Sequence, residues 1–104
     1  MLAIKIEITK FIDSHQPGFV ECRLFDAWNN EFTFRDKVPI FTSEDLNEKS
    51  NYPKPGIIAC FKIKESIDES NQKIITVNTI KPWDVESLDG IQEFEIFENQ
   101  LIEI

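Results

Sequence analysis

The chain opens with Leu2-Ala3-Ile4-Lys5-Ile6-Glu7-Ile8-Thr9, in which large apolar residues alternate with small or polar ones. A period of two is typical of a β-strand that buries one face and exposes the other. Phe11 and Ile12 interrupt the alternation, which indicates a bulge or the end of the strand. The segment therefore predicts a half-buried strand at the start of a β protein.

The same period recurs along the rest of the chain, between turns marked by Pro, Gly and Asn. A strand that starts at Glu31 is expected to continue, bent, through Val38-Pro39-Ile40-Phe41, and residues 101–104 are expected to add a short strand or to dock as a latch. The one helical signal is Thr42 followed by Asp45, which has the form of a capping box and predicts a short helical segment as far as Lys49. The other expected strands cover residues 19–28, 56–64, 73–80 and 93–97.

These segments predict an all-β fold, a small antiparallel barrel of about five to six strands that is either oligonucleotide-binding-like or of the elongation-factor type. A two-layer β-sandwich is the alternative. Hydrophobic residues make up 41% of the chain, with nine Phe and two Trp, and this is enough apolar material for a core. We therefore expect a single domain over residues 1–104.

Negative charge is concentrated at one end of the chain. No Lys or Arg follows Lys81, while residues 1–81 hold 12 acidic and all 11 basic side chains. The formal net charge is −8, so seven of these eight charges come from the last 23 residues. Such an excess repels phosphate backbones and anionic lipid heads and attracts basic partners. The carboxylates concerned are Asp84, Glu86, Asp89, Glu93, Glu95, Glu98 and Glu103.

The sequence predicts neither a membrane segment nor a disulfide. Lys5 and Glu7 interrupt the first apolar run, and no stretch approaches the roughly 18–20 apolar residues that a membrane span needs. Cys22 belongs to the core-facing set of its expected strand and Cys60 to the opposite set of its own, so two reduced thiols are expected. The expected compartment is the cytosol, in a bacterium or otherwise.

Nothing in the sequence forms a recognisable reactive centre. The only histidine, His15, falls in a predicted turn beside Pro17, and the three glycines are too few for a phosphate-binding loop. The acidic pairs are those of an ordinary solvated surface, and the basic residues are scattered too widely to form a track for phosphates. The sequence therefore predicts no enzyme, no metal, no cofactor and no nucleic-acid partner.

One stretch, Lys81-Pro82-Trp83-Asp84-Val85-Glu86-Ser87-Leu88-Asp89-Gly90, is distinctive. Together with Phe94 after it, and with Tyr52-Pro53 and Gly56-Ile57-Ile58 before it, it resembles small bacterial all-β proteins of about 100 residues without an assigned function. The resemblance implies a similar small β fold and brings no catalytic residues. In charge and size alone, the chain is also similar to immunity proteins that neutralise basic toxins.

Three functional hypotheses follow. The first is a non-enzymatic interaction module, in its sharpest form an immunity or inhibitor protein, that docks a basic protein surface. Trp83 is its expected anchor, although the favoured expectation for this residue is that it plugs the open end of the barrel. The expected carboxylates are Asp84, Glu86, Asp89, Glu93 and Glu95. The second is a barrel that binds a small ligand through Phe19, Phe25, Trp28 and Trp83. The third is a homodimer formed through exposed apolar faces, and the sequence leaves monomer and homodimer open.

Overall fold

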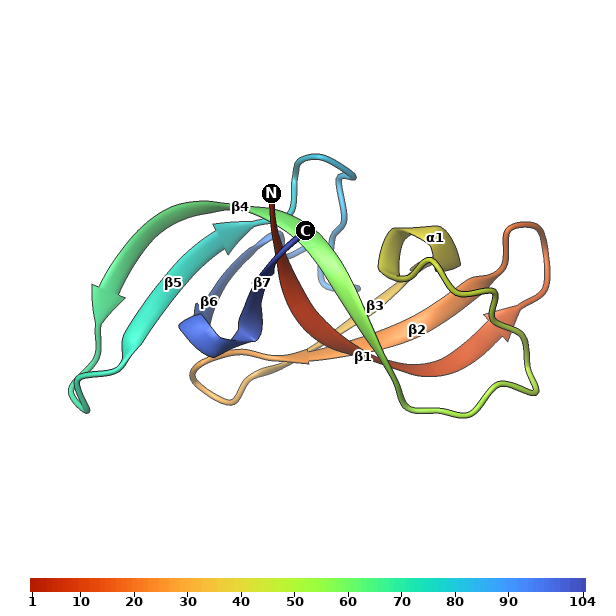
Figure 1. Ribbon diagram of the computed structural model, residues 1–104, viewed down its shortest axis with the longest axis horizontal. Helices are drawn as coiled ribbons and strands as arrows, with labels where there is room; N and C mark the ends of the chain where they lie inside the picture. The colour runs from red at the N-terminus through yellow and green to blue at the C-terminus, as the bar shows by residue number, and fades with distance from the viewer.

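Strands dominate the computed structural model, which describes all residues from 1 to 104 (Figure 1). One helical turn, α1, and one 3₁₀ turn, η1, complete it. In chain order the elements are β1 (Leu2–Asp13), β2 (Phe19–Phe25), β3 (Glu31–Lys37), α1 (Val38–Phe41), β4 (Lys54–Ile67), β5 (Lys73–Asn78), β6 (Glu93–Phe97), η1 (Glu98–Gln100) and β7 (Leu101–Glu103).

The strands form one antiparallel sheet in the order β3-β2-β1-β4-β5-β6, and β7 pairs with β1 beside this path. The sheet curls into a half-barrel, which confirms the predicted small all-β barrel. Two backbone hydrogen bonds bring its far ends together. The Ala27 amide after β2 donates to the Glu95 carbonyl of β6 (2.9 Å), and the Leu88 amide donates to the Thr33 carbonyl of β3 (2.8 Å).

Strand β1 is the centre of this arrangement. Its residues 2–8 pair with β4 along one edge, while its other edge pairs first with β7 and then, from Glu7 onward, with β2. The register with β2 shifts at Thr9 and again at Ile12, so the bulge that the sequence predicts near Phe11 and Ile12 is present. The pairing with β7 brings the two ends of the chain together, and the Ile104 amide donates to the Met1 carbonyl (2.8 Å).

The core lies inside the curl, where alternate residues of the strands meet. Phe94 of β6 lies edge-on to Phe32, with ring centroids 5.0 Å apart, and tilted against Phe34 at 5.7 Å. These contacts join β6 to β3 across the interior. Burial of apolar side chains in such a cluster is the main stabilising contribution to a fold of this size. The 16 clustered residues are Ile4, Ile6, Ile8, Val20, Cys22, Leu24, Phe34, Val38, Phe41, Ile58, Cys60, Ile75, Val77, Val85, Phe94 and Ile96.

The segment after β3 departs from the sequence prediction. Val38–Phe41 forms the helical turn α1 instead of continuing the strand. Pro39 lies in the first turn, where its missing amide proton costs nothing, and Val38 and Phe41 are buried. A Cβ on Gly56 would lie 2.9 Å from Ile8 Cγ1 and 3.2 Å from the Phe41 carbonyl oxygen, so α1 and β1 approach β4 closely at this glycine.

Two further predictions are wrong. No helix follows Thr42, whose hydroxyl instead accepts a hydrogen bond from the Glu44 amide (3.1 Å) in a local turn. Cys60 belongs to the core together with Ile58, because β4 turns that face, and not the face of Ile57, toward the interior.

Strand lengths differ in places from those expected. β4 runs to Ile67, three residues further than predicted, and β5 ends at Asn78 instead of residue 80. β2 ends at Phe25, and Trp28 lies in the turn that follows it. The Asp26 carboxylate holds this turn, because Oδ1 accepts hydrogen bonds from the amides of Trp28 (2.9 Å) and Asn30 (2.8 Å).

Candidate functional site

Five of the seven acidic residues after Lys81 lie in the connection between β5 and β6 or on β6 itself. We call residues 83–95 the acidic segment. Asp84, Glu86 and Asp89 lie in the connection, which stands out from the end of the sheet in Figure 1. Glu93 and Glu95 lie on β6 and point away from the core, on the face opposite to Phe94 and Ile96.

The connection is ordered by its own hydrogen bonds. Side chains along it alternate between buried Val85 and Ser87 and exposed Asp84, Glu86 and Leu88. The Val85 carbonyl accepts hydrogen bonds from the Thr79 hydroxyl (2.5 Å) and from the side-chain amide of Gln92 (3.2 Å). A backbone hydrogen bond from the Leu88 amide to the Thr33 carbonyl (2.8 Å) also ties this segment to β3, so its carboxylates are displayed on an ordered support.

Ser87 forms the hydrogen bonds that hold the turn at the tip of the connection. Its hydroxyl accepts a hydrogen bond from the Ile91 amide (3.0 Å), and its own amide donates to the Ile91 carbonyl (2.9 Å). Gly90 at the tip has φ +79°, a conformation that glycine adopts without strain. The tip is thus a defined turn.

Large apolar side chains accompany the carboxylates. Trp83 is 60% exposed and Leu88 56% exposed, and Ile91 is also exposed. Trp83 therefore does not plug the barrel, and that part of the sequence prediction is wrong. Exposed tryptophan within a charged surface is typical of protein–protein interfaces.

The carboxylates of the acidic segment have no cationic partner within 4 Å. Among the seven acidic residues after Lys81, Glu98 alone forms an ion pair, with Lys73 at 3.2 Å. Two others accept neutral hydrogen bonds: Asp84 from the side-chain amide of Gln92 (2.9 Å) and Glu95 from the Trp28 indole (3.2 Å). The negative charge of this surface is therefore not neutralised within the chain.

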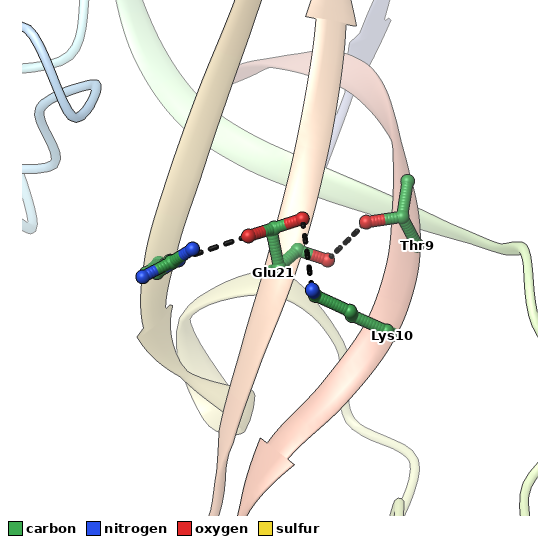
Figure 2. A network of polar contacts seen from close by, with 4 residues as sticks. Thr9, Lys10 and Glu21 are labelled. Carbon is green, nitrogen blue, oxygen red and sulfur yellow. Dashed lines mark hydrogen bonds and ion pairs between the residues drawn. The ribbon is translucent and has the colours of Figure 1, made fainter.

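The outer face of β1, β2 and β3 is different, because Glu21 on this face lies between two cations. Glu21 Oε1 lies 2.9 Å from Arg35 Nε and Glu21 Oε2 lies 3.8 Å from Lys10 Nζ. Figure 2 shows Glu21 beside Lys10, with the Thr9 hydroxyl donating to the Glu21 carbonyl (3.0 Å) at the bulge of β1. Arg23 and Glu7 form a further pair at 3.4 Å. Charge on this face links neighbouring strands.

The four aromatic residues of the ligand hypothesis do not enclose a common pocket. Side chains fill the inside of the curl. A surface hollow of about 220 Å³ is bordered by Phe25 but by none of the other three residues. Phe19 is half-buried on β2, Trp28 contacts Glu95, and Trp83 projects from the acidic segment. The arrangement gives this hypothesis no specific support.

The groups with chemical potential are dispersed. His15 lies in an exposed turn with Nδ1 2.5 Å from Asp13 Oδ1, and the hydrogen bonds from His15 lower the pKa of Asp13. Cys22 and Cys60 are free and buried. Burial raises the pKa of both thiols, that of Cys60 to about 11, which suppresses the reactive thiolate. No three or more His, Cys, Asp or Glu side chains are grouped as metal ligands.

Two features escaped the sequence analysis. The first is Asp26, which organises the β2–β3 turn; the signal that could have found it is that an Asp at the start of a turn often accepts a hydrogen bond from the amide two residues on, here that of Trp28. The second is the outer half of β4, where Phe61, Ile63 and Ile67 are exposed. Its apolar pattern predicts a strand, but the pattern does not show that one edge of this strand lacks a neighbour.

The chain matches no protein-family model, no curated protein and no solved structure. The resemblance drawn from the sequence thus stays a prediction. None of the helical turns in the structure has the length and apolar character needed to cross a membrane.

Proposed function

We propose that this protein is a non-enzymatic interaction module that docks a basic protein surface through its acidic segment. Trp83 is the apolar anchor, and an immunity or inhibitor protein is the sharpest form of the proposal. The free, buried thiols fit a reducing compartment, so we place its action in the cytosol. The carboxylates that carry the proposal are Asp84, Glu86, Asp89, Glu93 and Glu95.

The observation that carries the proposal is the set of carboxylates without a cationic partner on an ordered support. Unpaired charges of one sign repel one another and destabilise the compact state slightly, so within the chain alone they bring no gain. Opposite a basic surface they accelerate encounter and confer specificity. Because the connection is held by Val85 and Ser87, little conformational entropy is lost on docking.

The proposal is tested by two triple variants that change the net charge equally. Glu86→Lys, Asp89→Lys and Glu93→Lys reverse the acidic segment. Asp45→Lys, Glu48→Lys and Glu69→Lys reverse exposed acids elsewhere that have no ion pair. Each protein is used to capture partners from the native cell, and a captured protein is then purified and its association rate with all three chains is measured at low and at physiological salt.

We expect a basic partner whose association rate falls with added salt and falls steeply for the acidic-segment variant but little for the control variant. Equal association rates for the two variants would show that general charge, not this surface, drives binding. A partner that is acidic, or capture that survives reversal of the acidic segment, would also overturn the proposal.

A further inference from the structure

The outer half of β4 has an open edge. Residues 61–67 pair with β5 along one side. The neighbour on the other side, β1, reaches only as far as Leu2, which is opposite Cys60. In Figure 1 this half of β4 forms the outer margin of the β4–β5 hairpin, beyond the start of β1. A row of backbone amides and carbonyls along this edge is therefore free to pair with another strand.

Apolar side chains accompany this open edge. Phe61 is 46%, Ile63 47% and Ile67 59% exposed. Beside Phe61 lies a hollow of about 270 Å³, which Asn78, Ile80 and Lys81 complete. An edge with free backbone groups and an adjacent pocket is the arrangement by which domains take up extended peptides, because the backbone supplies affinity and the pocket supplies selectivity.

The charge at this edge is positive, in contrast to the whole chain. Glu65 is engaged by both Lys62 and Lys73. Lys64 and Lys81 have no acidic group within 4 Å, as the ion pairs of the chain involve other residues. Lys64 lies opposite Thr76 of β5, on the same face of the sheet as Phe61 and Asn78. Lys81 thus lines the hollow, and Lys64 lies further along the same face of the sheet, and neither cation forms an ion pair.

A second copy of this chain is a poor occupant. A two-fold axis through paired antiparallel edges places one residue opposite itself. Centred on Lys62 or Lys64, such pairing sets lysine against its own copy, and centred on Ile63 it sets Lys62 against Lys64. Centred on Glu65, it sets glutamate against glutamate. Every register that covers Ile63 thus places like charges opposite each other, which is destabilising.

We propose that the open edge of β4 binds an extended segment of a partner protein that carries an acidic and an apolar residue two positions apart, and so on the same face. The segment adds a strand beside residues 61–67, sets a carboxylate opposite Lys64 and places an apolar side chain in the hollow beside Phe61. This site is separate from the acidic segment and prefers the opposite charge, so its test is independent of the function proposed above.

The probe is a displayed library of random peptides of about nine residues, a length that spans this edge. The library is selected on the wild-type protein. The enriched sequence is then synthesised with blocked ends, together with an analogue that is N-methylated at alternate residues and so lacks the amides for strand pairing. Affinity is measured by fluorescence anisotropy for wild type, Lys64→Glu and Phe61→Ser, with Lys49→Glu and Phe25→Ser as matched exposed controls.

We expect enrichment of an acidic and an apolar residue two positions apart, a loss of about fivefold or more in affinity for Lys64→Glu and for Phe61→Ser, and little change for the controls. The N-methylated analogue should not bind. No enrichment, equal affinity of the enriched peptide for wild type and Lys64→Glu, or undiminished binding of the analogue would each overturn the proposal. A dimer in light scattering would also overturn the proposal if residues 61–67 became more protected from hydrogen exchange as the protein concentration rose. These two results together would show that the occupant of the edge is a second copy of the chain.

Discussion

The outer face of β1–β3 and the acidic segment place their charges in opposite ways. On the first, Glu21 lies between Lys10 and Arg35, so each strand is tied to its neighbour. On the second, Glu86, Glu93 and their neighbours have no cation nearby, although the backbone beneath them is well ordered. The contrast shows that charge in this protein serves two purposes. On one face it supports strand pairing, and on the other it remains available to a partner.

The largest expected effect comes from the core that both regions share. Phe94→Ala removes the ring that contacts Phe32 and Phe34, and we expect a loss of about 3–5 kcal/mol in the free energy of unfolding. Denaturant unfolding of single-tryptophan variants measures it, because Trp28 reports on the β2–β3 turn and Trp83 on the acidic segment. Coincident midpoints are expected if the two regions unfold together. Separate midpoints would show that the two regions do not unfold together. A loss of unfolding free energy no greater than that for exposed Phe25→Ala would show that Phe94 does not hold a shared core.

The next effect concerns the turn that joins the two regions. Asp26→Ala removes the acceptor for the amides of Trp28 and Asn30, and we expect a loss of about 1–3 kcal/mol, since these amides lose their partner. Amide hydrogen exchange at Ala27, which donates to Glu95 on β6, should accelerate. Asp26→Asn keeps one acceptor oxygen and serves as the control. Equal stability of Asp26→Ala and wild type would show that the turn held by Asp26 does not stabilise the contact with β6.

A smaller effect tests the comparison directly. Glu21→Gln should cost about 0.5–1 kcal/mol, and the cost should shrink in concentrated salt, because Glu21 bridges two cations. Glu93→Gln should change stability by less than about 0.5 kcal/mol, toward higher stability, since it removes one unpaired charge. Chemical denaturation at low and high salt measures both. Similar losses for the two variants would contradict the division between paired and available charge.

The last effect is absent at neutral pH and appears only at alkaline pH, at Cys60 in the core that both regions share. The Cys60 thiol has an ordinary pKa of 9.0 when exposed and a pKa raised to about 11 by burial in the folded chain. Its contribution to stability is therefore complete below pH 9 and is lost as the pH rises toward 11. The difference in unfolding free energy between wild type and Cys60→Ala, followed from pH 7 to 11, isolates this contribution. A difference that does not change with pH would contradict it.

Alternation of apolar and polar residues was sufficient to predict most of the strands. Residues 93–97 were predicted with the bounds that β6 has, because one of their faces is apolar and the other acidic. β4 was harder, since Ile57 and Ile58 make both faces apolar and only packing against β1 decides which one is inside. Val38–Phe41 has the composition of a strand, but burial of Val38 and Phe41 on one side of a helical turn prevails.

The position of the candidate site could be predicted from the sequence, but whether its carboxylates form ion pairs could not. The absence of Lys and Arg after residue 81 locates the excess charge in the sequence. Whether lysines from elsewhere neutralise it depends on three-dimensional pairing, which brings Lys73 to Glu98 and leaves Glu86 and Glu93 unpaired. The support beneath the site depends on Val85 and Ser87, and their burial follows from the contact of this connection with β3.

Residue 1 and residue 104 are joined by a backbone hydrogen bond where β7 lies beside β1. A few flexible residues would therefore suffice to connect them, and new ends opened in the polar turn at Asp68–Gln72 would yield a circularly permuted chain with the same strand pairs. The same closeness lets the whole half-barrel be inserted into a surface loop of a host protein without spreading that loop. The protein is thus suited to be inserted, as one folded acidic domain, into another protein.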